Sequence, residues 1–398
     1  MTTLPSAVAS QFTPADRELL VALRRDLHRA PELAWQEHAT RARLKAALTA
    51  VGVTDVREVA KTGLVARIAG SGKHRAIVAV RGDIDALPIT EATGLPFASQ
   101  TAGVMHACGH DMHAAWAVGA AMLLARAPAV GEVRIVLQPA EEVGEGATAI
   151  LASGALDGVE AIFGAHVDWR YRVGEVVADA GPLAASTDTF EITFHGRGGH
   201  GARPQDAIDP IIGLAAFIGD AQTIVSRILD PALPGVITVG AVEAGQAANV
   251  IPESARCRGT IRATTPAARH LLCTELDRVA HTVATTHRLT ATVSLSEGTP
   301  PLVNTARAAG WAQQSVRALL GDAALKSLTV ANMGGEDVAY YTERMEGCFL
   351  RIGTWSEGRS RAGVHTPHFD PDENALLVGA AVLAECARRA SAALASTP

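Results

Sequence analysis

The stretch Met105-His106-Ala107-Cys108-Gly109-His110-Asp111-Met112-His113 is the densest cluster of potential metal ligands in the chain. It holds three of the 14 histidines and one of the five cysteines, together with an aspartate. Thiolates, imidazoles and carboxylates are the side chains that bind zinc and related transition metals. The alternative is a polar loop around a buried cysteine, because free cysteines are often simply core residues. We therefore predict a metal site whose remaining ligands come from elsewhere in the chain.

Three short apolar runs each lead to acidic or histidine side chains. The runs are residues 76–80, 133–137 and 161–167, and they bring Asp83 and Asp85, Glu141 and Glu142, and His166, the last at the end of its run. Any one of these side chains alone is more often a capping or solvated residue. In an open α/β sheet, however, ligands bind at the C-terminal ends of the strands. The recurrence predicts that these side chains meet at one edge of a sheet.

The rest of the pattern predicts two domains. Helices are expected near residues 14–30, 37–50, 114–127 and 373–394. Between them, strands near 190–194, 236–242, 256–262 and 289–295 and helices near 210–227 and 266–286 follow the order β-α-β-β-α-β. That order is typical of a ferredoxin-like unit. We predict an α/β catalytic domain of residues 1–183 and 298–398, with a small α+β domain of residues 184–297 inserted in it.

Composition limits the partners and the compartment. The 398 residues suffice for two or three domains, and the formal net charge of −6 argues against nucleic acid or an anionic membrane as a partner. No stretch approaches 18 apolar residues, so no membrane span is expected. Residues 1–6 lack the basic and apolar segments of a secretory signal, and the five cysteines are too scattered for a disulfide framework. We expect a cytoplasmic protein.

No candidate ligand or pair of ligands indicates a metal site by itself, but together they do. Cys108 and His110 are two residues apart, so in extended backbone both side chains would point the same way and could bind one ion. Further ligands are expected from Glu142, from His166 and from a histidine of the segment 364–368. The tandem glutamates allow one carboxylate to bind metal while the other accepts a proton from water. Taken singly, a core histidine or an exposed acidic pair would be the ordinary interpretation.

Several longer motifs resemble the metal-dependent amidohydrolase, aminoacylase and carboxypeptidase family, which includes hippurate hydrolases, auxin-conjugate hydrolases, N-acetyldiaminopimelate deacetylases and bacterial aminoacylases. The motifs are residues 81–89, 93–97, 105–111, 138–142, 199–202, 249–252, 259–262, 335–337 and the segment around His365. The resemblance runs in order from about Leu27 to Glu373. It implies a zinc-peptidase-like mixed-sheet catalytic domain with an inserted ferredoxin-like lid and dimerisation domain.

The resemblance also implies a centre of two divalent metal ions per subunit. Its ligands would be Cys108, His110, Glu142, His166 and His365, with Cys108 shared between the ions and His365 favoured over His368. Glu141 would activate the attacking water. Asp83, Asp85 and Asp111 are expected to hydrogen-bond to the ligands and orient them, as ligating imidazoles usually require. His106 and His113 are expected either to be structural or to support the ligands in the same way. Zinc or manganese is expected, and nickel or cobalt would also suit these side chains.

In the inserted domain, the resemblance gives three residues a role toward substrate. His200 would polarise the scissile carbonyl, in its own subunit's site or in that of a partner in a homodimer or larger assembly. Asn249 and Arg262 would hold the substrate's carboxylate, for which an arginine fork is well suited. Without the resemblance, His200 is a residue of a glycine-rich loop and Arg262 an ordinary strand residue.

The expected reaction is hydrolysis of the amide bond of N-acyl amino acids or related small conjugates, which releases a carboxylic acid and an amino acid. The same metals could instead serve a dipeptidase, an N-carbamoyl amino acid hydrolase or an aminohydrolase. A thiol hydrolase with Cys108 as nucleophile and His110 or His113 as base, or a non-catalytic binding protein, are alternatives of another class. After His166 the chain reads Val167-Asp168-Trp169, where relatives often carry a proline, so the adjoining pocket is expected to differ.

Overall fold

The computed structural model describes residues 4–72, 76–328 and 332–396, and it divides the chain into two compact units. The first unit consists of Met1–Gly181, Asn304–Thr329 and Tyr340–Pro398, and the second of Pro182–Val303 and Val330–Ala339. The predicted inserted domain of residues 184–297 falls inside the second unit. That unit is slightly longer at both ends and also includes a segment from the C-terminal part of the chain.

The first unit is built on a mixed eight-stranded sheet with the order β1-β2-β4-β3-β5-β16-β6-β15. Its strands are β1 (Val56–Val59), β2 (Gly63–Ile68), β3 (Ile77–Asp83), β4 (Glu132–Gln138), β5 (Val159–Arg172), β6 (Val176–Val177), β15 (Leu325–Lys326) and β16 (Glu346–Trp355). The four central strands are parallel, and β2 pairs antiparallel with β4. The predicted mixed-sheet α/β fold is confirmed, and the four parallel strands are almost entirely buried, as parallel strands usually are.

Helix α2 (Pro14–Arg29) begins where the sequence predicts it. Thr13 and Asp16 form a capping box, in which the Thr13 hydroxyl accepts from the Asp16 amide and the Asp16 carboxylate accepts from the Thr13 amide. Such caps stabilise a helix by roughly 1 kcal/mol. The buried face of the helix carries Leu20, Leu23 and Leu27. This helix therefore has both a local start signal and an apolar stripe.

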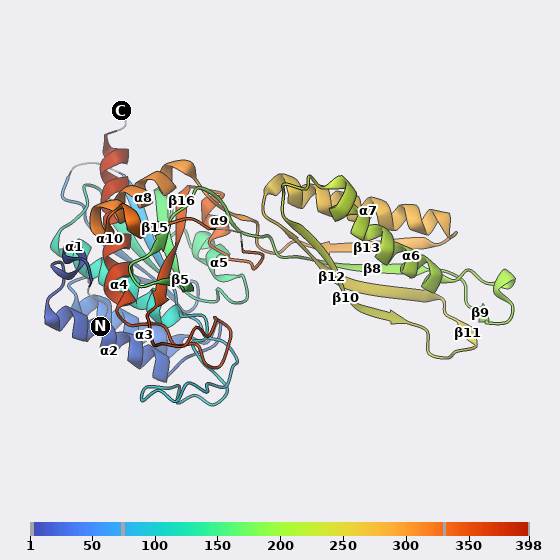
Figure 1. Ribbon diagram of the computed structural model, residues 1–398, viewed down its shortest axis with the longest axis horizontal. Coiled ribbons are helices and arrows are strands. Elements are labelled where there is room, and N and C mark those ends of the chain that lie inside the picture. Colours follow the sequence, from blue (N-terminus) through green and yellow to red (C-terminus); the bar gives the residue numbers. More distant parts are fainter. Residues whose placement is uncertain (1–3, 73–75, 329–331, 397–398) are drawn as a thin grey trace. The chain divides into compact units, whose positions relative to one another are not determined.

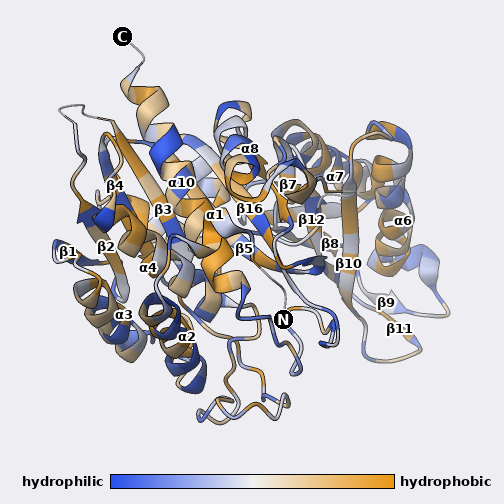
Figure 2. Cartoon of the chain, turned by 60° about the vertical axis from the view of Figure 1, so that its left-hand side comes forward, coloured by the Kyte–Doolittle hydropathy of each residue, from blue (hydrophilic) through white to orange (hydrophobic). Residues whose placement is uncertain are grey.

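Helices α4 (His110–Arg126) and α10 (Ala375–Ala395) pack against each other and against strands β3 and β5. The absence of a side chain at Gly379 permits the close approach, because a Cβ atom there would lie 2.4 Å from the Trp116 indole ring. The Trp116 indole N–H donates to the Ala375 carbonyl at 2.9 Å. The remaining helices are α1 (Ser6–Ala9), α3 (His38–Ala50), α5 (Gly146–Ala152), α8 (Ala306–Leu320) and α9 (Ala339–Thr342). Hydropathy colouring shows strands β3 and β4 as largely hydrophobic (Figure 2).

The second unit has the predicted β-α-β-β-α-β order. It contains β8 (Asp188–His195), α6 (Pro210–Thr223), β10 (Gly235–Ala244), β12 (Ser254–Ala263), α7 (Pro266–Thr286) and β13 (Thr290–Ser296). The strands form an antiparallel sheet in the order β10-β12-β8-β13, and both helices cover one face of it (Figure 1). This is the ferredoxin-like arrangement. Short strands β9 (Gly199–His200) and β11 (Val250–Ile251) pair beyond the end of the sheet, and β7 (Gly181–Ala184) pairs with β14 (Leu302–Asn304).

One helical stretch reaches the length of a membrane span, although it contains no run of 18 apolar residues. Pro210–Ile228, formed by α6 and a π-helical turn, has 19 residues and a window of mean hydropathy 1.4, of which 28% is buried. Its length and composition would allow a span. However, Leu214 and Phe217 are buried in the core of the second unit, and Asp220 and Arg227 lie within the stretch. A single helix of this kind is weak evidence, and the absence of a membrane partner stays a prediction.

Candidate metal centre

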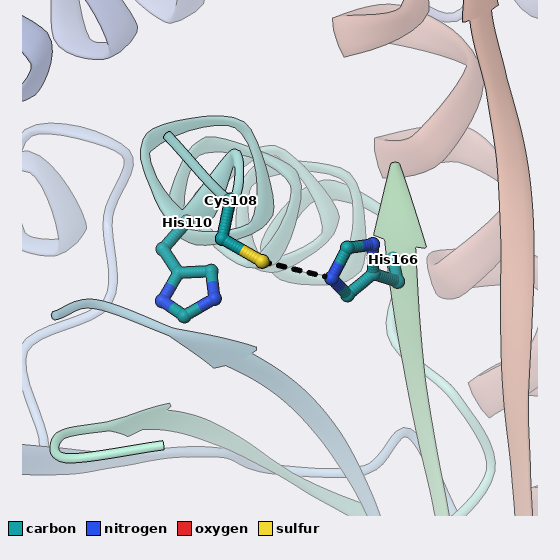
Figure 3. Close-up of side chains that lie close together, drawn as sticks. All are labelled: Cys108, His110 and His166. Carbon is teal, nitrogen blue, oxygen red and sulfur yellow. Dashed lines mark hydrogen bonds between the residues drawn. The ribbon is translucent and has the colours of Figure 1, made fainter. Parts of the chain in front are cut away.

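A tight turn at Gly109 brings Cys108 and His110 together. Gly109 has a φ of +87° and caps helix α4, and His110 is the first residue of that helix. The predicted extended backbone is therefore wrong, and the two side chains converge because the chain turns between them (Figure 3). A side chain at residue 109 would also meet Val167 at 2.7 Å. Glycine is required here both for its backbone conformation and for space.

Cys108 lies at the centre of the predicted ligands. Its sulfur is 3.3 Å from Nε2 of His166 and 3.3 Å from Nε2 of His365. Cys108, His110 and His166 each offer a ligand atom within 4.8 Å of the others, and Cys108 forms a second such group with Glu142 and His365. The thiol thus belongs to two overlapping groups of potential ligands. This is the arrangement expected of a side chain shared by two ions.

His166 reaches the site from within a strand. Strand β5 continues to Arg172, so the prediction that His166 ends its strand is wrong. The parallel pairing of β3 with β5 stops at Arg81 and Gly164, however, and the same register places His166 level with Asp83, the last residue of β3. Nδ1 of His166 is 2.7 Å from the Val167 carbonyl oxygen, to which it donates, and Nε2 is left to face Cys108. His166 therefore lies at the predicted edge of the sheet, which is formed by the C-terminal end of β3.

Of the two histidines that could be the predicted C-terminal ligand, His365 lies near the other candidate ligands and His368 does not. Nε2 of His365 lies 3.5 Å from a Glu142 carboxylate oxygen, in addition to its contact with Cys108. His368 instead places Nδ1 3.0 Å from the Ala92 carbonyl oxygen. The structure thus brings His365 to the other candidate ligands, and it gives His368 a backbone contact elsewhere.

The two glutamates follow a turn with unusual backbone geometry. Ala140 has a φ of +54°, and the chain then presents both following carboxylates near His110. Nε2 of His110 is 3.8 Å from an oxygen of Glu141 and 3.8 Å from an oxygen of Glu142. Both side chains are only about one-tenth exposed (11% and 12%). Glu141 therefore forms a group with His110 and Glu142, in which the three potential ligand atoms lie within 4.8 Å of one another.

The donor set fits transition-metal ions. Nε2 of His110 and Oε1 of Glu142 are buried and have no hydrogen-bond partner among the described residues. Buried polar atoms are normally paired, so two unpaired atoms that face a common point need an explanation. A thiol, three imidazoles and a carboxylate are ligands that zinc, nickel and cobalt accept, and manganese tolerates. The residues present therefore fit the metal centre that the sequence predicts.

Asp85 contacts two of the predicted ligands, His110 and Glu142, without being one itself. Its Oδ1 is 3.2 Å from Nδ1 of His110, and its Oδ2 accepts from the Glu142 amide at 3.0 Å. One buried carboxylate thus orients one potential ligand and fixes the backbone of another. Such carboxylate contacts commonly set the tautomer and direction of a ligating imidazole.

Asp83 contacts a histidine outside the predicted ligand set. Its Oδ1 is 2.7 Å from Nδ1 of His113, and Nε2 of His113 accepts from the Val167 amide at 2.9 Å. Although burial alone would raise it, the pKa of Asp83 is held well below its usual range by its histidine and arginine neighbours, His110 above all. His113 thereby links β3 to the strand that carries His166.

Asp111 and His106 lie behind the ligands. The Asp111 carboxylate accepts from the Arg24 guanidinium at 2.7 Å and is 2.8 Å from Nδ1 of His28, both on helix α2. The structure therefore places Asp111 in a bond to α2 rather than against a predicted ligand. His106 is buried, with both ring nitrogens unpaired among the described residues, and burial lowers its pKa to about 4. Its imidazole is accordingly neutral at physiological pH.

The surroundings of Cys108 disfavour a thiol nucleophile. Burial raises the pKa of the Cys108 thiol to about 12, despite the opposing effect of His110. The thiolate is the reactive form, so a thiol with this pKa is a poor nucleophile at neutral pH. A bound cation is what would favour its deprotonation.

Of the residues predicted to touch substrate, two lie together and one lies apart. His200 pairs with Val250 across β9 and β11, and the Gly201 amide donates to the Asn249 carbonyl at 2.8 Å. Arg262 lies near the far end of β12, eight residues after Ser254. At about 3.3 Å per residue, that separation along the strand is on the order of 25 Å. Asn249 directly precedes β11, which pairs with β9 beyond the Ser254 end of this strand, so Asn249 and Arg262 of one chain are too far apart to touch one small molecule.

Comparison with known proteins assigns the family. Residues 79–389 match the profile of peptidase family M20/M25/M40. The chain belongs to this family. It is 39% identical over 377 residues to an N-acetyl-L-cysteine deacetylase from Bacillus subtilis, covering 93% of this chain and 88% of the relative. It is 37% identical to the IAA-amino acid hydrolase ILR1-like 2 of Arabidopsis thaliana, with 94% and 86% covered.

A solved M20 structure has the same fold. The Bacillus subtilis YxeP protein, a dinuclear metal binding peptidase of the M20 family, superposes with a TM-score of 0.83 at 36% sequence identity. The match covers 94% of this chain and 98% of that protein. The resemblance stated from the sequence motifs is thereby confirmed, as is the fold that it implies.

Proposed function

We propose that this M20 protein hydrolyses the amide bond of N-acyl amino acids or of related amino acid conjugates. The observation that carries the proposal is the convergence of Cys108, His110, Glu142, His166 and His365, with Glu141 beside them. The relatives with the names N-acetyl-L-cysteine deacetylase and IAA-amino acid hydrolase support an amide between an acyl group and an amino acid. Their names differ in the acyl group, acetyl in one and IAA in the other.

Those five ligands would hold two divalent metal ions, with Cys108 shared. When bound, the ions supply Lewis acidity, which acidifies water and polarises a carbonyl oxygen. We propose zinc or manganese as the resident metal, with nickel or cobalt compatible with the same ligands. Asp85 would keep His110 and the Glu142 backbone in position.

Glu141 would carry the proton through the reaction. Its carboxylate lies next to His110 and Glu142 but is proposed as a base and not as a ligand. It would accept a proton from the attacking water and later donate it to the nitrogen of the departing amino acid. General acid–base catalysis of this kind typically contributes about 100-fold to 10,000-fold in rate. The product pair would be a carboxylic acid and a free amino acid.

A substrate panel tests the proposal directly. Protein reconstituted with manganese or zinc should release amino acids from N-acetyl or N-benzoyl amino acids, measured with an amine-reactive dye. N-carbamoyl amino acids and dipeptides are the contrasting substrates, because the same metals could serve those bonds. Preference for either contrast would replace the proposed substrate class, and no turnover of any amide would refute the enzyme assignment.

We further propose that the active form is a dimer in which His200 completes the site of the other subunit. Asn249 lies beyond one end of β12 and Arg262 near its other end, which supports this, because two chains are needed if both residues hold one substrate. His200 would stabilise the developing negative charge on the carbonyl oxygen. The family resemblance implies the same role for this histidine. The five free cysteines are consistent with a reducing compartment, for which we propose the cytoplasm.

Mixing two inactive variants tests the exchange of His200. A Glu141→Gln subunit and a His200→Ala subunit, allowed to exchange at equal amounts, should recover about one quarter of wild-type activity. Half of the dimers would then contain one intact site out of two. The exposed His281 on α7 provides a control, since His281→Ala should retain full activity on its own. Activity no higher than the sum of the parent variants would mean that His200 acts in its own subunit.

A further inference from the structure

We propose that Glu37 is a positioning residue that holds the turn from which Glu141 and Glu142 project. The inference deepens the proposed function, on which it rests for the roles of the two glutamates. The sequence alone does not single out Glu37, because an acidic residue just before a helix is ordinary. Its environment in the structure is different.

Glu37 directly precedes helix α3, yet its side chain points into the protein. The residue is fully buried at 0% exposure. One carboxylate oxygen accepts from the Ala140 amide at 2.9 Å, and the other accepts from the Thr62 hydroxyl at 2.7 Å. No arginine, lysine or histidine pairs with it within the described ranges. A buried carboxylate without a cationic partner is unfavourable, so its hydrogen bonds need to compensate.

The bond from the Ala140 amide lies at the strained point of the loop of residues 139–145, which joins β4 to α5. Ala140 has a φ of +54°, a left-handed conformation that side-chain-bearing residues adopt only when their surroundings enforce it. Its carbonyl oxygen accepts from the Gly146 amide at 3.1 Å, and the Glu141 carbonyl accepts from the Gly144 amide at 2.7 Å. The loop thus closes on itself through its carbonyl groups. The Ala140 amide is not used in these bonds within the loop, and it donates to Glu37 instead.

The backbone is held on both sides of Glu141. Glu37 accepts from the amide at residue 140, and Asp85 accepts from the amide at residue 142. Glu141 lies between these two anchored peptide groups. The direction in which its side chain leaves the backbone is therefore fixed by two buried carboxylates, one from the segment before α3 and one from the segment after β3.

A second contact ties the same N-terminal segment to the loop. The Trp35 indole N–H donates to the Glu145 carboxylate at 2.8 Å, and the Lys61 ammonium lies 4.4 Å from the centre of the Trp35 ring. Trp35 and Glu37 thus contact the loop at residues 145 and 140. The N-terminal segment braces the loop at both ends, although it contributes no predicted ligand.

Two substitutions at Glu37 separate positioning from other roles. In Glu37→Gln, the amide oxygen can still accept from Ala140 and the amide nitrogen can donate to the Thr62 hydroxyl. We expect its kcat to stay within about threefold of wild type. Glu37→Leu removes both bonds, and its kcat should fall about 10-fold to 100-fold with KM within about threefold, because Glu141 loses its alignment. Both variants should retain two metal ions by elemental analysis.

Two further readouts do not depend on turnover. Amide hydrogen exchange at residues 140–142 should be faster in Glu37→Leu than in wild type and unchanged in Glu37→Gln. The visible absorption of the cobalt-loaded protein should change in Glu37→Leu, because Glu142 shifts with the loop. Glu32→Leu is the matched control, since Glu32 accepts from the Ala39 and Thr40 amides at the start of the same helix and lies outside the loop contacts. It should lower the melting temperature and leave kcat unchanged.

The outcomes are distinct. Wild-type kcat and wild-type hydrogen exchange in Glu37→Leu would overturn the proposal. So would a Glu37→Gln variant as impaired as Glu37→Leu, because the negative charge and not the hydrogen bonding would then matter. A loss of kcat that merely follows lost metal would also overturn it. If the wild-type protein cleaves no N-acyl amino acid, the proposed function fails, while the exchange and absorption measurements still decide the role of Glu37.

Discussion

Glu141→Gln should lower kcat at least about 1,000-fold while both metal ions stay bound. Glutamine has nearly the same size and can keep its contacts, but it cannot accept the proton of the attacking water. Glu142, His110, Cys108 and the remaining ligands are untouched, so metal content by elemental analysis should equal that of wild type. KM should change little, because the substituted group acts on the reacting atoms and does not bind the substrate in its ground state.

Two comparison variants make this result specific. Glu160→Gln, an exposed glutamate at the start of β5, should keep wild-type activity. Glu142→Gln should lose activity together with metal, since that carboxylate lies 3.5 Å from His365 and within the ligand group of Cys108. Near-normal turnover by Glu141→Gln would refute its role as the base. Metal loss in that variant would instead make Glu141 a ligand.

Metal removal should abolish activity, and alkylation should not. Dialysis against a strong chelator is expected to lower activity at least about 1,000-fold, with recovery on addition of manganese or zinc. Iodoacetamide applied to the metal-loaded protein should leave activity intact, because Cys108 is only 6% exposed and its sulfur faces His166 and His365. Without metal, the raised thiol pKa of about 12 also keeps Cys108 largely unreactive at neutral pH.

This pair of treatments separates the metal hydrolase from a thiol hydrolase. A thiol enzyme would survive chelation and would be inactivated by alkylation. Mass spectrometry of the treated protein should locate any modification at the half-buried Cys273 before the buried Cys108. Activity that persists in a metal-free preparation, with metal content checked on the same sample, would exclude the proposed mechanism.

The regular elements were largely predictable, because each carries a local signal. Helix α2 has its capping box and apolar stripe, and α7 runs over Pro266–Thr286 as expected from its proline start. The order of strands and helices in the second unit predicts a ferredoxin-like fold, and the observed sheet confirms it. In these segments the periodicity of the side chains and the end signals agree, which is the condition under which sequence patterns are reliable.

The contacts within the site were harder to predict, since they depend on residues far apart in the chain. The bond from Glu37 to Ala140 spans 103 positions, and no local pattern relates the two. The same holds for the bond of Asp111 to Arg24, 87 positions away. The sequence pattern does not predict the turn at Gly109, for another reason. Glycine there permits the left-handed conformation that starts α4 four residues earlier than the apolar pattern indicates.

The central place of Cys108 has a consequence for the folding of the chain. Cys108 and His365 are 257 positions apart, so an ion held by both would act as a cross-link that closes a very long loop. Restricting the unfolded chain in this way stabilises the folded state, and long loops gain the most in principle. Ligands that assemble only in the native protein also couple affinity to folding. On the proposed assignment, the supply of metal in the cell would therefore govern how long the protein survives as well as how fast it works.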